Sequence, residues 1–259
     1  PRTLFPYTTL FRSAPSAYVP PLSQTCLTTP PQANDGILGF TTASALESAK
    51  TQTHELKFQR TPLLIPSLAK IVSLAAGNNH ILALSSTGQV FAWGTAEQRQ
   101  LARRVPSRTR IGALTPSRVA LPPITLIAAG AYHSFAIADS GTVYAWGANN
   151  FGQTGIPSHA GDSDTIIPLP TPIPALGAYA IRAIASGEHH SLACTQEGQV
   201  LIWGRSNDHQ AGLSLSTLPL STLPDSTSTS TSTSTLILDS RARPPILAPT
   251  LIPDLSSVE

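Results

Sequence analysis

The chain has 259 residues, of which 41% are hydrophobic and 12% are charged, and its formal net charge is +2. This length is enough for one large or two ordinary domains, and so small a net charge does not favour nucleic acid as a partner for the whole chain. No apolar run approaches the ~18 residues that a membrane-spanning helix needs, so we expect no membrane segment.

Residues 1–33 are expected to lie outside the folded domain. The chain contains no Met, and the stretch TLFPYTTLFRS from Thr3 to Ser13 resembles the translation of a sequencing-adapter oligonucleotide, so it is excluded from the fold prediction. A native Pro/Thr-rich tail is the alternative. Residues 14–33 are rich in Pro, Thr and Ser without a hydrophobic period, which indicates disorder.

Three segments of the remaining chain, 34–259, repeat one pattern. They are IVSLAAGNNHILALSSTGQVFAWG from Ile71, ITLIAAGAYHSFAIADSGTVYAWG from Ile124 and IRAIASGEHHSLACTQEGQVLIWG from Ile181. Each contains Gly-x-x-His, a turn glycine and a final Trp-Gly, and insertions fall only between the segments. A period of about 50 residues indicates a repeat architecture.

Each repeat is expected to form short β-strands. Apolar residues alternate with small or polar ones, and STG, DSG and QEG are typical of hairpin turns. The stretches that follow, QVFAWG, TVYAWG and QVLIWG, are rich in β-branched and aromatic residues and favour strands. Apolar pieces bounded by proline lie at 62–68, 170–176 and 249–255, and proline is tolerated in edge strands. About four antiparallel strands per unit predict an all-β fold, a partial β-propeller built of four-stranded blades.

The predicted units follow one another along the chain. Residues 34–68 are expected to end one blade, and the repeat cores lie near 71–101, 124–155 and 181–213. An insert over 214–240 contains STSTSTSTST and indicates disorder. Residues 241–259 are expected to start a further blade.

The repeat resembles that of the regulator of chromosome condensation family. The motifs that carry the resemblance are Gly-x-x-His, the turn glycine, Val-x-x-Trp-Gly and NNFGQTG, and it covers about residues 34–259. Glycine rather than aspartate follows each tryptophan, which distinguishes the pattern from the Trp-Asp repeat. The resemblance implies a seven-bladed ring, of which this chain would be a fragment.

The segments between the repeats are similar to those of the family's exchange factors for the small GTPase Ran. ANDGILGF at 33–40 resembles the end of the blade that carries their β-wedge, and QLARRVPSRTRIGALTPSR at 100–118 resembles the long loop after the next blade. The resemblance implies a guanine-nucleotide exchange factor rather than an enzyme with covalent chemistry, with no cofactor. It also implies a nuclear, chromatin-associated protein, with the cytoplasm as a second compartment. A non-catalytic protein-binding propeller of the same family is the alternative.

The resemblance implies a set of contacts to the GTPase. The residue before the repeated histidine varies between Asn79, Tyr132 and His189, and exchange factors use this rim position to contact Ran. Among these three, His189 is expected to affect turnover, and a solvated loop residue is the alternative at each position. Further contacts are expected from Asn34, Asp35, Arg103, Asn150 and Glu188.

Six arginines lie between residues 99 and 118 without an acidic residue among them: Arg99, Arg103, Arg104, Arg108, Arg110 and Arg118. Such a charge run favours an acidic partner, because the guanidinium fork suits carboxylates. The resemblance implies that Arg108 and Arg110 bind the acidic histone surface of the nucleosome. A solvated basic loop is the alternative. Ala102 departs from the family pattern, which has glycine there.

Residues that recur unchanged in all three repeats are expected to be structural. They are Gly77, His80, Trp93, Gly130, His133, Trp146, Gly187, His190 and Trp203. We expect each histidine to bond neighbouring backbone and hold its own hairpin. The pair His189–His190 is not expected to bind a metal, because adjacent strand residues point to opposite faces and further ligands at metal spacing are missing.

Overall fold

The computed structural model describes residues 65, 67–105, 113, 115–157, 165–207 and 246–252. This part of the chain forms three four-stranded antiparallel sheets and a short 3₁₀ helix, η3 (Pro174–Leu176). The predicted all-β class and the four-stranded antiparallel blades are therefore confirmed. Residues 1–33 and the Ser/Thr-rich insert at 214–240 lie outside the described residues.

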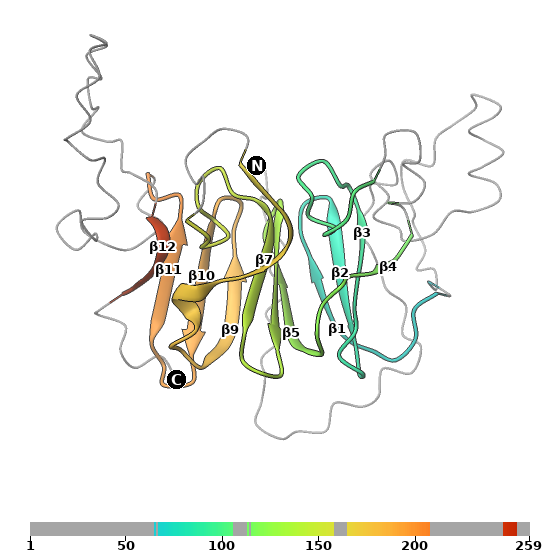
Figure 1. The fold of residues 1–259 in the computed structure, drawn as a ribbon, viewed down its shortest axis with the longest axis horizontal. Helices are drawn as coiled ribbons and strands as arrows, with labels where there is room; N and C mark the ends of the chain where they lie inside the picture. The colour runs from blue at the N-terminus through green and yellow to red at the C-terminus, as the bar shows by residue number, and fades with distance from the viewer. Residues whose placement is uncertain are drawn as a thin grey trace, which may run out of the picture.

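The three sheets lie side by side as blades (Figure 1), and within each sheet the strands follow in chain order. The first sheet contains β1 (Ile71–Ala76), β2 (His80–Ser85), β3 (Val90–Gly94) and β4 (Ser117–Arg118). The second contains β5 (Ile124–Ala129), β6 (His133–Ala138), β7 (Val143–Ala148) and β8 (Ile166–Pro172). The third contains β9 (Ile181–Ser186), β10 (His190–Thr195), β11 (Val200–Gly204) and β12 (Ile246–Leu251).

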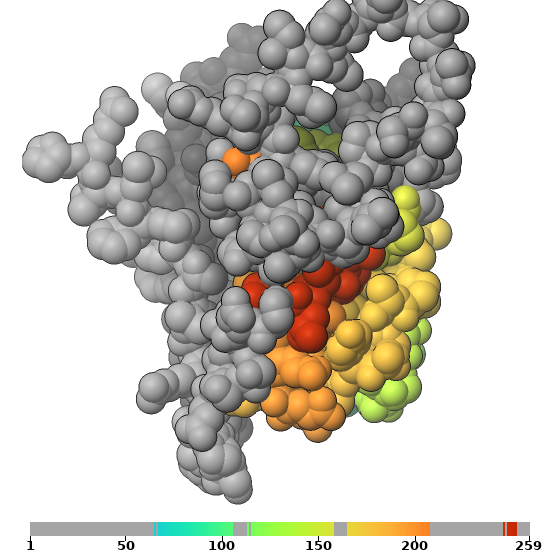
Figure 2. Space-filling model, turned by 90° about the vertical axis from the view of Figure 1, so that its left-hand side faces the viewer, coloured from blue at the N-terminus to red at the C-terminus, as the bar shows by residue number. Residues whose placement is uncertain are grey.

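Proline-bounded segments form the outermost strands of the second and third blades. β8 reads IIPLPTP and pairs with β7, and β12 reads ILAPTL and pairs with β11. Proline cannot donate to a ladder, so an outer strand suits it. Figure 2 shows β12 at the surface, beside the segment around η3. The expectation that 241–259 starts a further blade is therefore wrong for β12, whose backbone pairs with β11 of the third blade.

The core lies between the blades as well as within them. β2 and β6 are buried along their whole length, because neighbouring elements cover both of their faces. The tryptophans Trp93, Trp146 and Trp203 are all 0% exposed, each near the end of the third strand of its blade. One hydrophobic cluster extends from β2 through the second blade to β11 and β12, so burial of apolar surface joins the three sheets.

Two glycines of each repeat are required by close approaches. A Cβ on Gly77, Gly130 or Gly187 would collide with the imidazole of the histidine three residues later. The glycine after each tryptophan has positive φ, as Gly94 does with +113°, and a Cβ there would collide with backbone of the residue preceding the histidine. These contacts explain why Gly-x-x-His and Trp-Gly recur together.

The repeated histidines of the first two blades bond the blade that follows. His80 Nε2 lies 2.9 Å from Ser134 Oγ, and this hydroxyl donates to the main-chain carbonyl of Gln100 over 3.2 Å. Trp146 Nε1 donates to the same carbonyl over 2.8 Å. The expectation that the imidazole holds its own hairpin is therefore wrong for His80, because its partner is a serine hydroxyl of the next blade.

The second junction repeats this arrangement. His133 Nε2 lies 2.9 Å from Ser191 Oγ, and Ser191 Oγ and Trp203 Nε1 each donate to the Gln153 carbonyl over 2.9 Å. The single serine proton is used on the carbonyl, so the histidine must donate, and both rings are therefore Nε2–H tautomers. Burial lowers the pKa of His80 to about 4 and that of His133 to about 3, which keeps them neutral at physiological pH.

Ser191→Ala should lower the free energy of unfolding of the full-length protein by about 1–3 kcal/mol, because the buried His133 N–H loses its acceptor and the Gln153 carbonyl loses one donor. Denaturant unfolding measures the change. Ser140→Ala is the control, because Ser140 lies in an exposed turn. Equal effects of the two substitutions would contradict the assigned bonds.

Candidate functional site

The three varied positions lie at one end of the blades. In an antiparallel meander the turn between the first two strands and the loop after the third strand meet at the same end. Asn79, Tyr132 and His189 directly precede β2, β6 and β10, and all three are partly exposed. Their carbonyls accept hydrogen bonds from Thr95, Ala148 and Arg205, over 2.6, 3.0 and 2.8 Å. The backbone is thus fixed while the side chain differs from blade to blade.

A clamped loop follows β7 and reaches the third blade. The buried Asn149 side chain donates to the Ile156 carbonyl over 2.9 Å and accepts from the Thr154 hydroxyl over 2.6 Å. Gln153 Oε1 accepts the Phe151 N–H, and Gln153 Nε2 donates to Asn150 Oδ1, both over 2.8 Å. Since the Gln153 carbonyl also bonds the third blade, the loop holds Asn150 and Phe151 at the junction.

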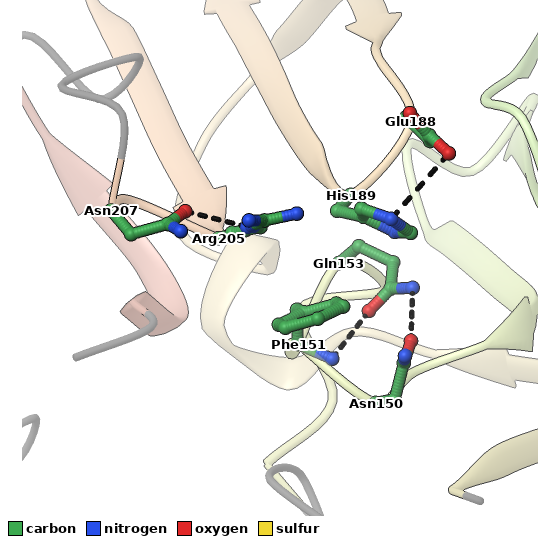
Figure 3. A network of polar contacts seen from close by, with 7 residues as sticks. All are labelled: Asn150, Phe151, Gln153, Glu188, His189, Arg205 and Asn207. Carbon is green, nitrogen blue, oxygen red and sulfur yellow. Dashed lines mark hydrogen bonds and ion pairs between the residues drawn. The ribbon is translucent and has the colours of Figure 1, made fainter. Parts of the chain in front are cut away.

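Side chains from the second and third blades meet beside this loop (Figure 3). The ring centroids of Phe151 and His189 are 4.7 Å apart, and the Arg205 guanidinium carbon lies 5.2 Å from the Phe151 centroid. His189 Nε2 is 3.6 Å from Glu188 Oε1, and Arg205 Nε donates to Asn207. We call these residues, with Asn150, the junction cluster: Asn150, Phe151, Glu188, His189, Arg205 and Asn207.

The surroundings of His189 lower the pKa of its imidazole, which favours the neutral form at physiological pH. Burial is the main cause that lowers its pKa, the nearby Arg205 charge lowers it further, and Glu188 acts in the opposite direction. The side chain is 22% exposed, and its Nδ1 is buried without a hydrogen-bond partner. A neutral imidazole between an anion and a cation suits contact with a polar protein surface.

Three members of this cluster are residues for which the sequence predicted contacts with a GTPase. The structure brings Asn150, Glu188 and His189 together, while Asn79 and Tyr132 lie at the same end on the first and second blades. Four other predicted site residues lie outside the described residues: Asn34, Asp35, Arg108 and Arg110. In the described part, no group of three or more His, Cys, Asp or Glu could hold a metal ion.

Arg103 is placed apart from the cluster, in the loop after β3. Its guanidinium donates to the carbonyls of Ala92 over 2.9 Å and of Thr115 over 3.3 Å, and burial lowers its pKa. These bonds link Arg103 to β3 and to Thr115. A structural role therefore stands beside the predicted contact of Arg103 with a partner.

The loop that contains Arg103 and the clamped loop after β7 both have left-handed backbone at two equivalent positions. Arg99 and Ala102 have φ of 58° and 55°, where Gly152 and Gly155 both have 73° in the second blade. Side chains in this region cost roughly 1–2 kcal/mol each. The departure of Ala102 from the family's glycine is therefore a strained position in the folded chain.

Several residues of the site and its support were missed by sequence reasoning. His-Ser occurs at 133–134 and again at 190–191, and a glutamine follows the tryptophan by seven residues at Gln100 and Gln153. Both repeats were visible signals. Arg205 carried no such signal, because the other repeats have different residues at its position, and Phe151 lay in the motif NNFGQTG without being predicted as a site residue.

Known proteins resemble this chain over most of its length. A family model of the RCC1-like domain matches residues 26–259. Protein pim1 of Schizosaccharomyces pombe is 37% identical over 225 residues, covering 87% of this chain and 37% of pim1. The guanine nucleotide exchange factor SRM1 of Saccharomyces cerevisiae is 37% identical over 194 residues, covering 74% of this chain and 38% of SRM1.

Solved structures agree with these matches. The crystal structure of Prp20p from Saccharomyces cerevisiae superposes with a TM-score of 0.69 at 32% identity, covering 87% of this chain and 46% of Prp20p. The chain thus spans less than half the length of each of these three relatives.

Among the described residues, no helix is long and apolar enough to cross a membrane.

Arg103→Ala should lower the free energy of unfolding by about 1–3 kcal/mol, because two carbonyls lose a charged donor. Arg104→Ala is the matched control. Arg104 is the exposed neighbour of Arg103, so its substitution should change the free energy of unfolding by less than about 0.5 kcal/mol. Thermal or denaturant unfolding of the full-length protein compares the two. A stable Arg103→Ala variant would show that the two bonds contribute little.

Proposed function

We propose that this chain, which belongs to the RCC1-like domain family, is part of a guanine-nucleotide exchange factor for a Ran-type small GTPase. Two relatives support the activity: SRM1 is named a guanine nucleotide exchange factor, and Prp20p is described by its binding to Gsp1p and histones. The observation that carries the proposal is the junction cluster, a polar and aromatic group held rigidly across two blades at the end where the varied positions lie.

The GTPase would contact several blades at once. Each blade presents a different side chain from the same backbone position, namely Asn79, Tyr132 or His189. Asn150, Glu188 and Arg103 extend this face in the proposal, and Asn34 and Asp35 belong to it outside the described residues. A surface built from several blades can match one conformation of a partner closely, because its side chains are fixed relative to one another.

Nucleotide release follows from differential affinity. The propeller accelerates exchange if it binds the nucleotide-free GTPase more tightly than the nucleotide-bound form. His189 contributes a neutral imidazole to that contact, so the step needs neither covalent chemistry nor proton transfer. The protein is thus a regulator, and the guanine nucleotide is bound by its partner.

His189→Ala in the full-length protein should slow nucleotide release from the GTPase about tenfold, the effect of losing one central interface residue. The fold should stay nearly as stable, since the side chain is partly exposed and its Nδ1 has no partner. Release of a fluorescent guanine nucleotide from the loaded GTPase measures the rate. Gln196→Ala is the control, because Gln196 is exposed in the β10–β11 turn at the opposite end of the blade.

The same assay separates exchange from scaffolding. If the wild-type protein binds the GTPase without accelerating release, the non-catalytic propeller is the correct function. If the wild-type protein accelerates release and His189→Ala matches it, exchange depends on other residues of the face.

We also propose chromatin docking in the nucleus through the basic segment that contains Arg108 and Arg110. The support is the run of arginines between residues 99 and 118 and the histone binding described for Prp20p. The residues proposed for docking differ from those of the junction cluster, so docking and exchange could occur together.

The Arg108→Ala/Arg110→Ala double variant should weaken nucleosome binding, and the loss should shrink as salt rises because exposed charges are screened. Nucleotide release from the free GTPase should be unchanged. Binding to reconstituted nucleosomes at several salt concentrations measures the first effect. Equal nucleosome affinity of variant and wild type would exclude this segment as the docking site.

A further inference from the structure

Gln153 connects the backbone of Phe151 to the third blade. The Phe151 N–H donates to Gln153 Oε1 over 2.8 Å, and the carbonyl of the same glutamine accepts from Ser191 Oγ and Trp203 Nε1 of the third blade. The backbone that carries the ring is therefore anchored to the blade that carries His189. The ring reaches that blade from a fixed position.

Few polar contacts fix the His189 imidazole. Its Nδ1 is buried without a hydrogen-bond partner, and Glu188, at 3.6 Å from Nε2, is 63% exposed. The Phe151 ring lies 4.7 Å away at an interplanar angle of 47°. A tilted aromatic pair of this kind holds a ring by packing, so Phe151 contributes to the orientation of the His189 imidazole.

Arg205 is held near the same ring. Its guanidinium carbon lies 5.2 Å from the Phe151 centroid, within the range of a cation–π contact, and its Nε donates to Asn207. Phe151 thus organises a neutral ring and a cation that come from the two ends of one β-hairpin, β10–β11 (Figure 3).

The first junction lacks this arrangement. Gln98 occupies the position of Phe151, with its N–H on Gln100 Oε1 over 2.9 Å, and Tyr132 occupies that of His189. The loop geometry is therefore kept without an aromatic ring at this position. Phe151 is not required to form such a loop, which leaves its ring free to serve the neighbouring side chains.

We propose that Phe151 is a positioning residue for nucleotide exchange, which fixes the His189 imidazole and keeps Arg205 beside it. The inference rests on the exchange function proposed above. Phe151 acts through His189 in this account. Loss of the ring should free the imidazole to rotate and expose it to water.

Exposure would also change the titration of His189. Burial is the main cause of its lowered pKa, so removing Phe151 should raise that pKa toward its ordinary value. The charged or titratable groups around His189 are Glu188 and Arg205, and His133 and His190 are coupled to it from the neighbouring strands. All four remain in a Phe151 variant, so the change can be attributed to the ring.

The test compares four variants of the full-length protein: Phe151→Ala, Phe151→Tyr, His189→Ala and the double variant Phe151→Ala/His189→Ala. Release of a fluorescent guanine nucleotide from a Ran-type GTPase gives the rates. We expect Phe151→Ala to be about 3- to 10-fold slower, Phe151→Tyr to match wild type, and the double variant to be no slower than His189→Ala alone.

An NMR pH titration gives a second readout, in which the His189 midpoint should rise in Phe151→Ala. If melting shows that Phe151→Ala does not fold, Phe151→Leu replaces it, because leucine keeps bulk without a flat ring.

The outcomes separate the two proposals. A slow His189→Ala with a normal Phe151→Ala rate overturns the positioning role and leaves the exchange site standing. A double variant slowed by the product of both single effects also overturns it, since Phe151 would then act independently. A normal His189→Ala rate overturns the positioning role and removes His189 from the exchange site, whereas a wild-type protein that does not accelerate release overturns the proposed function itself.

Discussion

Two glutamine main-chain carbonyls join the blades of this protein, and the rest of the structure depends on them. The carbonyls of Gln100 and Gln153 each accept a serine hydroxyl and a tryptophan indole of the following blade. The hydroxyl oxygen of that serine in turn accepts a hydrogen bond from the histidine Nε2–H of the preceding blade. Every polar atom of this link is buried, so breaking one bond leaves a desolvated group unpaired. Burial of apolar surface holds the sheets together, and this link fixes how adjacent sheets align.

The candidate site uses the same link. The side chain of Gln153 orders Asn150 and Phe151 while its carbonyl holds the third blade. The histidine of the repeat stays constant because the next blade needs it, whereas the residue before it only has to supply a carbonyl to the Trp-Gly strand. That position can therefore carry Asn79, Tyr132 or His189 without a change of fold. The constant histidine and the varied residue before it are therefore neighbours in the chain.

Much of this architecture could be predicted from the sequence, because its signals are local. Hairpin glycines, alternating apolar residues and Trp-Gly predicted the strands and the four-stranded blades, and the family resemblance pointed to His189. The partner of each histidine could not be predicted, since Ser134 and Ser191 lie 54 and 58 residues further along the chain from the histidines that they bond. The sequence predicted only part of the junction cluster for the same reason. Arg205 reaches Phe151 only through the packing of two blades.

The most direct test of the link between the blades is ¹⁵N NMR of the imidazoles of His80 and His133 in the full-length protein, which reports the tautomer and the titration of each ring. Both rings should be Nε2–H tautomers at neutral pH, since each must donate to a serine whose proton is used on a glutamine carbonyl. Their midpoints should lie well below the ordinary value of 6.5, at about 4 for His80 and about 3 for His133, because both rings are buried. Nδ1–H tautomers, or titration near 6.5, would contradict the link between the blades.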